Sequence, residues 1–289
     1  MNLFVDHFYD RGDTHDFCED YAFSGKNTSG TIAFAIVSDG CSSSDHVDVG
    51  ARILIHATHG YFKEIFENET CLSSCDKIKI GTGLIRHLSS YLSPEKKHLD
   101  FLSLPFQSLD ATLIFAVSDG KRSFVFIYGD GGVITKNNCG EVGYRSVTYL
   151  SGAPYYLSNV FSHINKELYR KFYGVGNVYY EIDGQTCKSI SAEDGIANGE
   201  IYTNGFFEFG PDITSITVST DGIGSYQRRN GDGVIVGVPV TEMAVDFSDY
   251  KNANGSFVKR RMQMIAVNCR KNGTTHYDDV SAATIIIKD

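Results

Sequence analysis

A chain of 289 residues with 42% hydrophobic and 21% charged residues is long enough to bury a core and too apolar to be disordered. Its formal net charge of −9 argues against a nucleic-acid partner, which a basic patch would normally mark. No run is long enough to span a membrane, and the first residues lack the features of a signal peptide. We therefore expect a cytoplasmic protein without a membrane partner.

Short apolar runs rich in β-branched residues predict buried strands at 31–37, 111–117, 123–128, 213–218 and 282–287. Apolar residues at helical spacing predict helices within 51–65, 84–92, 161–172 and 256–270. Two of these helices follow one another early, and the strands come in groups. This grouping favours an α+β layered fold over strict alternation of strands and helices.

The stretch 135–210 is rich in Tyr, Gly, Asn and Ser and has little periodicity outside the short predicted helix. We interpret it as strands and loops of the same domain, and we expect a mobile, flap-like surface element within it. The whole chain, residues 1–289, is accordingly predicted to form a single domain.

Acidic residues follow or precede the predicted strands. They are Asp39 in IVSDG, Asp130 in IYGDGG, Asp221 in VSTDG, and the pair Asp278 and Asp279 in HYDDVSAATI. Mg²⁺ and Mn²⁺ prefer carboxylate and carbonyl oxygens, and strand ends converge where sheets share an edge or pack together. A glycine after the acid is expected to permit a turn that would strain other residues. Taken singly, however, each Asp-Gly pair is also typical of an ordinary hairpin turn.

Taken in order, these motifs resemble those of the metal-dependent protein phosphatases of type 2C. The matching segments are FCEDYAF, which contains Glu19 and Asp20, then Asp39-Gly40, LDATLIF at 109–115, YGDGG at 128–132, STDG at 219–222 and DDVSAATIII at 278–287. The likeness covers nearly the whole chain. It implies a four-layer αββα sandwich, in which two packed antiparallel sheets are flanked by helix pairs and two metal ions bind at one end.

The resemblance also implies roles for the acids near the first ion. Asp39 would bridge two Mg²⁺ or Mn²⁺ ions, and the Gly40 carbonyl would offer a further oxygen. Asp221 and Asp278 would hold the first ion.

Three more acids take roles from the same resemblance. Glu19 would serve the second ion, directly or through water, and Asp20 would orient a metal-bound water. Asp130, together with Asp221, would hold the third ion found in bacterial relatives.

Two positions depart from the family pattern. The family commonly has an Arg four residues before the Glu19 position, where it clamps the substrate phosphate; this chain has His15, which resembles a bacterial subgroup, and Arg11 is the alternative clamp. Asp279 stands where Asn usually follows the metal-binding Asp. Since side chains alternate along an extended strand, only one of Asp278 and Asp279 should face the ions. The family register selects Asp278, so Asp279→Asn is expected to be tolerated.

The resemblance implies hydrolysis of phosphoserine and phosphothreonine monoesters by a water or hydroxide that two metal ions activate. The partner would be a phosphorylated protein, with a cognate kinase or its targets as further candidates. Two alternatives stay open: a small-molecule phosphohydrolase, and a catalytically inactive binding module that keeps the fold without metals. Retention of Asp39, Asp221 and Asp278 speaks against the inactive module, because clustered like charges repel one another when no ion is bound.

Overall fold

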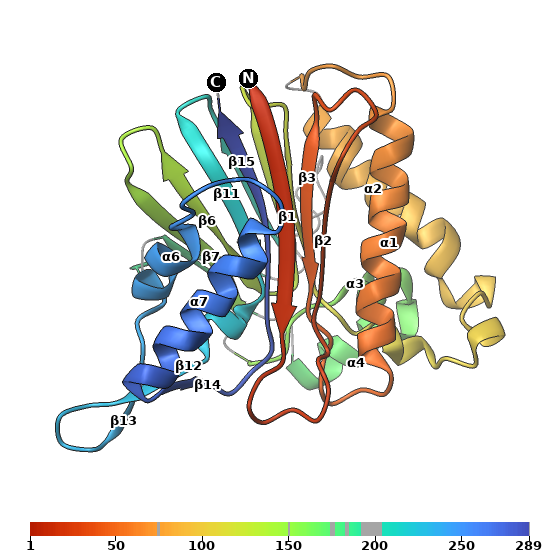
Figure 1. Cartoon of the computed structure of the whole chain (residues 1–289). Helices are drawn as coiled ribbons and strands as arrows, with labels where there is room; N and C mark the ends of the chain where they lie inside the picture. Colours follow the sequence, from red (N-terminus) through yellow and green to blue (C-terminus); the bar gives the residue numbers. More distant parts are fainter. Residues whose placement is uncertain (74–75, 150, 174–176, 183–184, 192–203, 289) are drawn as a thin grey trace.

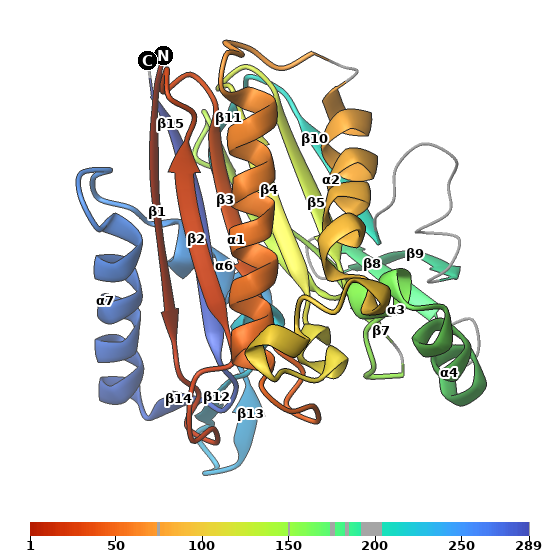
Figure 2. The same ribbon diagram turned by 90° about the vertical axis from the view of Figure 1, so that its right-hand side faces the viewer.

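Two antiparallel sheets pack face to face, and helices cover the outer face of each (Figures 1 and 2). The computed structural model describes residues 1–289 except 74–75, 150, 174–176, 183–184, 192–203 and 289. The arrangement confirms the predicted α+β fold with four layers. No helix in the described part of the chain is both long and apolar enough to cross a membrane.

The smaller sheet has five strands in the order β10-β5-β4-β3-β2. Its central strands are buried at every position, as their continuous apolar runs predict. Helices α1 and α2 pack on its outer face, where Phe34, Phe62 and Phe115 form part of one core. The elements of this half are β2 (Tyr21–Lys26), β3 (Ala33–Ser38), α1 (Val47–Phe66), α2 (Asp76–Leu92), β4 (Leu113–Ser118), β5 (Ser123–Tyr128) and β10 (Gly205–Phe209).

The larger sheet has seven strands in the order β1-β15-β11-β6-β7-β8-β9. Within it, β1 pairs with β15 along the full length of both strands, from Asn2 opposite Lys288 to Asp10 opposite Val280. Helices α6 and α7 cover its outer face. The elements of this half are β1 (Asn2–Asp10), β6 (Gly131–Asn137), β7 (Val142–Tyr149), β8 (Asn177–Ile182), β9 (Gln185–Ser191), β11 (Ile213–Ser219), α6 (Val240–Ser248), α7 (Phe257–Asn272) and β15 (Val280–Lys288).

Three hydrophobic cores hold the two sheets and the two layers of helices together. Ile114, Val133 and Ile285 belong to the core between the sheets, and the other two cores lie between each sheet and its helices. Burying each such side chain contributes about 1.5–3 kcal/mol. The strand ends are thereby fixed, and they carry the acidic residues.

Shorter elements complete the fold. A small third sheet has the order β13-β12-β14. The stretch 135–210 contains the end of β6, then β7, α3, α4, β8, β9 and β10; residues 150, 174–176, 183–184 and 192–203 within it lie outside the described residues. That the chain forms one domain with a mobile flap therefore stays a prediction. The bounds are η3 (Phe106–Leu109), α3 (Leu157–Phe161), α4 (His163–Tyr173), η4 (Asp221–Gly224), β12 (Tyr226–Arg229), β13 (Ile235–Gly237) and β14 (Thr274–His276).

Candidate metal centre

The predicted acids come from strand ends in both sheets. Asp39 follows β3, Asp130 lies between β5 and β6, Asp221 follows β11, Asp278 precedes β15, and Asp20 directly precedes β2. The loop that joins β1 to β2 lies at the end of the sandwich away from the two termini (Figure 1). The packing of the two sheets therefore brings together residues that are far apart in the sequence.

Asp39 lies at the centre of this group. Its carboxyl group lies close to those of Asp20 and Asp221 and interacts with both. Desolvation by burial, followed by repulsion from Asp20 and Asp221, raises the pKa of Asp39 well above its usual value. A side chain in contact with two other acids is the arrangement expected of a residue that bridges two cations.

The neighbouring carboxyl groups are perturbed in the same direction. Desolvation raises the pKa of Asp20 to about 8. Desolvation together with repulsion from Asp278 raises the pKa of Asp221 to about 6, although part of the Asp221 residue is exposed to solvent. Desolvation and the charge of Asp221 raise the pKa of Asp130, and desolvation raises that of Asp278. The five acids therefore form one electrostatic cluster, which a bound cation would stabilise.

These pKa values predict how stability depends on pH without divalent ions. Asp20 and Asp221 bind protons more strongly in the folded chain than in the unfolded chain. Their contribution to stability is present below the ordinary Asp pKa of about 4 and is lost as pH rises through about 6 and about 8. We expect the Tm of chelator-treated protein to fall by several degrees across this window, and Mn²⁺ to restore it most at the alkaline end. Asp20→Asn should flatten this dependence. A Tm that responds neither to pH nor to Mn²⁺ would contradict the clustering.

Backbone pairing beside β4 fixes Asp39. The Asp39 N–H donates to the Thr112 hydroxyl at 2.9 Å, and the Thr112 N–H donates to the Asp39 carbonyl at 2.8 Å. Gly40 pairs with Ala111 in an isolated bridge, and a Cβ at Gly40 would lie 2.8 Å from the side chain of Val47 in α1. Asp39 is thus held between β4 and the first turn of α1.

The reason for glycine after each acid differs from the expectation in two cases. Gly131, after Asp130, does have a positive φ of 124°. Gly40 does not, nor does Gly222 after Asp221; a Cβ at Gly222 would lie 1.7 Å from the Asp279 carbonyl oxygen. At these two positions the requirement is close packing, because any side chain would collide with its neighbour.

Asp20 is held from the opposite sheet. It is 1% exposed, and the Thr220 hydroxyl donates to its Oδ2 at 2.7 Å. Thr220 in turn accepts from the Ser281 N–H at 3.0 Å, which connects β11 and β15 to the residue that precedes β2. Sequence reasoning assigned no role to Thr220; its place directly before Asp221 in STDG was the available signal.

Asp279 is the residue that sequence reasoning set aside and that the structure makes central to the loop between β1 and β2. It is 2% exposed; its Oδ1 accepts from the Gly12 N–H at 2.7 Å and its Oδ2 from the Glu19 N–H at 2.6 Å. His15 Nδ1 lies 3.0 Å from the same Oδ2. Asp279 therefore fixes the loop that carries the predicted residues His15 and Glu19.

His15 lies among the acids of this region. Desolvation lowers its pKa, but the hydrogen bond to Asp279 and the charges of Asp279, Asp278 and Glu19 outweigh that effect, so the pKa is raised. Its Nε2 lies 3.6 Å from Asp278 Oδ1. Arg11 is exposed, and its guanidinium donates to the carbonyl oxygens of His15 and Asp16. Both predicted phosphate-binding residues thus lie on the loop that Asp279 anchors.

The donor atoms fit a hard divalent cation. Glu19 Oε2 and Asp20 Oδ1 are buried and accept no hydrogen bond, and such an oxygen carries a cost unless a cation or water satisfies it. Potential ligand atoms of His15, Glu19 and Asp279 also lie within 4.8 Å of one another. The site therefore offers carboxylate-rich positions suited to Mg²⁺ or Mn²⁺, while the metal's identity stays a prediction.

Comparison with solved structures agrees with the fold described above. A point variant of a bacterial serine phosphatase matches with a TM-score of 0.56 and 12% identity over 98% of both chains. The serine/threonine phosphatase Stp1 from Staphylococcus aureus matches with a TM-score of 0.53 and 12% identity over 100% of this chain and 96% of that one. The S. agalactiae serine/threonine phosphatase matches with a TM-score of 0.53 and 10% identity over 99% of this chain and 100% of that one. These likenesses show the shared fold.

Sequence comparison identifies the family. A search of curated protein sequences finds no match. The family model described as protein phosphatase 2C, however, matches residues 11–234, which include Glu19, Asp39, Asp130 and Asp221. The chain therefore belongs to the protein phosphatase 2C family of enzymes.

Proposed function

We propose that this chain hydrolyses phosphoserine and phosphothreonine monoesters on proteins, with Mg²⁺ or Mn²⁺ bound by its clustered carboxylates. The supporting observation is the set of converging acids with raised pKa values around Asp39, together with buried oxygens of Glu19 and Asp20 that have no hydrogen-bond partner. An inactive binding module would gain nothing from holding these like charges together.

We assign the ion-binding roles as follows. Asp39 touches both Asp20 and Asp221, which suits a residue shared by two ions. Asp221 and Asp278 would complete the first site, Glu19 and the Gly40 carbonyl the second, and Asp130 with Asp221 a third. When bound, divalent ions offset this negative charge, polarise the phosphoryl group and make water a stronger nucleophile.

The chain's own residues position the reactants. Thr220 holds Oδ2 of Asp20, so Oδ1 is available to accept a proton from water and orient it. The acids beside His15 raise its pKa, which favours the positively charged imidazolium, and this cation would attract the substrate phosphate. We assign the phosphate clamp to His15 before Arg11, because the Arg11 guanidinium already donates to two backbone carbonyls.

The test is an assay with p-nitrophenyl phosphate and a phosphothreonine peptide after removal of bound metal. We expect Mn²⁺ or Mg²⁺ to raise both rates by at least about tenfold, because the nucleophile depends on the ions. Full activity in excess chelator would contradict the proposal. Hydrolysis of p-nitrophenyl phosphate but of no phosphopeptide would favour a small-molecule phosphohydrolase. Metal binding without hydrolysis of either substrate would favour a binding module.

The same assay addresses the partner. We expect the substrate to be a phosphorylated protein. The candidate substrates are a cognate kinase and the proteins that this kinase phosphorylates. Release of phosphate from intact phosphoproteins, compared at matched concentrations, would rank them.

A further inference from the structure

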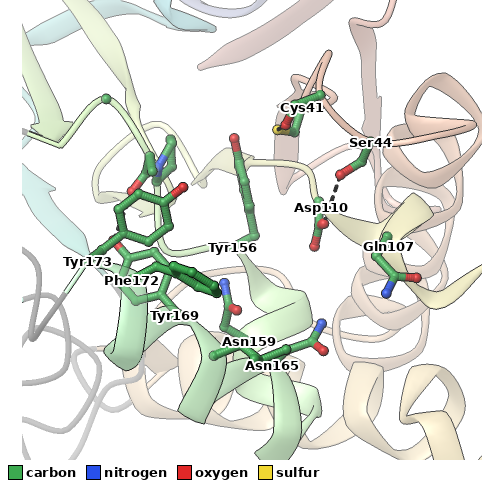
Figure 3. Close-up of a pocket in the computed structure, with 15 residues that line it drawn as sticks. Cys41, Ser44, Gln107, Asp110, Tyr156, Asn159, Asn165, Tyr169, Phe172 and Tyr173 are labelled. Carbon is green, nitrogen blue, oxygen red and sulfur yellow. Dashed lines mark hydrogen bonds between the residues drawn. The ribbon is translucent and has the colours of Figure 1, made fainter.

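A cavity of about 360 Å³ lies between the loop that follows β3 and helices α3 and α4. Figure 3 shows Asp110 on one side of it and Tyr169 and Tyr173 on the other, with Tyr156 between them. The polar groups around it include Ser44, Gln107, Asn159 and Asn165. None of the roles assigned above uses this cavity.

The cavity adjoins the acidic cluster through one paired segment. The Cys41 N–H donates to the Asp110 carbonyl at 2.8 Å, and Cys41 is two residues beyond Asp39. On the other side of the same segment, Thr112 forms the backbone contacts that hold Asp39. A group bound in the cavity would therefore lie beside the phosphate site, within reach of a residue close to the phosphorylated one.

Asp110 sets the charge of the cavity. It is the only charged side chain among the described residues that line it. The Ser158 hydroxyl donates to its Oδ1, and the Ser44 hydroxyl donates to its Oδ2 at 3.0 Å. Both partners are neutral, so no counter-cation pairs with this carboxylate within the described part of the chain, and desolvation raises its pKa. A positive ligand would supply the missing charge.

The rest of the wall suits a cation as well. Tyr156, Tyr169 and Tyr173 present aromatic rings, whose faces attract ammonium and guanidinium groups. The amide oxygens of Gln107 and Asn165 can accept hydrogen bonds from such groups. An acidic ligand would instead meet the charge of Asp110, and a purely apolar one would leave that carboxylate desolvated without a partner.

We propose that this cavity binds a basic side chain, Lys or Arg, located near the phosphorylated residue of the protein substrate. The inference rests on the proposed phosphoprotein phosphatase function. It assigns Asp110 as the residue that selects the charge of the substrate and the tyrosines as the wall against which the cation lies.

The experiment measures kcat/KM for phosphothreonine peptides in which one neutral position at a time carries Arg, Lys, Ala or Glu. At one or two positions we expect wild-type enzyme to prefer Arg or Lys over Ala by about tenfold, and to disfavour Glu. The preference is read as a ratio within each enzyme, so differences in overall activity between variants cancel.

Asp110→Asn tests the assigned residue, because Asn preserves the size and can still bond to both serine hydroxyls. The ratio should fall to about twofold or less in this variant. Asp100→Asn is the matched control: it removes the same charge from an exposed residue outside the cavity and should keep the wild-type ratio. Tyr173→Ala, at a residue that is 48% exposed, should reduce the ratio about threefold without opening a buried void.

The outcomes separate this inference from the function on which it rests. Metal-dependent hydrolysis of p-nitrophenyl phosphate and of all peptides with equal efficiency would overturn the cavity proposal and leave the phosphatase function intact. An undiminished ratio in Asp110→Asn would also overturn it. Absence of hydrolysis with every substrate would instead overturn the proposed function, and the cavity proposal with it.

Discussion

Asp39→Asn is expected to lower kcat for phosphopeptide hydrolysis by about a thousandfold at saturating Mn²⁺, the magnitude typical of losing a principal electrostatic element of an active site. Asp39 interacts with both Asp20 and Asp221 at the centre of the acidic cluster. Removing its charge would weaken the binding of two ions together. Steady-state kinetics across a Mn²⁺ titration would measure both the loss of turnover and the loss of affinity.

The chain contains a matched control for this variant. Asp119 occupies the same Ser-Asp-Gly sequence after β4, but its carboxylate accepts from the backbone N–H groups of Leu72, Lys121 and Arg122. Asp119→Asn should therefore keep its activity and affect stability only. Near-wild-type turnover in Asp39→Asn, or an equal loss in both variants, would remove Asp39 from the centre of the site.

Asp279→Ala is expected to lower kcat/KM about a hundredfold and to weaken Mn²⁺ binding, an effect typical of residues that orient metal ligands. The substitution leaves the N–H groups of Gly12 and Glu19 without their acceptor and deprives His15 of its closest carboxylate. Each unsatisfied buried donor costs about 1–3 kcal/mol. The loop that carries Glu19 and His15 would then lose its fixed position.

Asp279→Asn provides the graded comparison. An amide keeps one accepting oxygen and turns its NH₂ toward the other N–H donor, so we expect a loss of about tenfold rather than the tolerance that the sequence alone suggested. Asp278→Asn should weaken metal binding directly, because the Asp278 carboxylate belongs to the acidic cluster. Wild-type metal affinity in Asp279→Ala would show that the loop is held by other contacts.

The sequence predicted the buried strands well because their signal is local. β3, β4 and β5 are continuous apolar runs, buried at every residue. β1 was not predicted, because NLFVDHFYD carries charged and polar residues and is only partly buried. β8 and β9 were read only as part of a strand-and-loop excursion, since their pairing in the larger sheet depends on partners distant in sequence.

In the candidate site, too, local sequence predicts some residues, and contacts between distant segments determine the roles of others. Asp39 and Asp119 share one tripeptide, and nothing local distinguishes an acid in the cluster from an acid that caps a turn; the ordered family motifs made that distinction. The roles of Asp279 and Asp110 depend on contacts with Gly12, Glu19 and Ser158, at separations of 48 to 267 residues. Such contacts become visible only once the two sheets are placed together.

The pairing of β1 with β15 has a consequence for synthesis. On the ribosome, β1 emerges long before its partner β15. Asp278 and Asp279 directly precede β15, so the loop of residues 11–19 lacks this anchor until β15 has been synthesised. Contacts this distant in sequence make closure of the sheet a late event. The proposed metal centre can therefore assemble only after β15 has been synthesised.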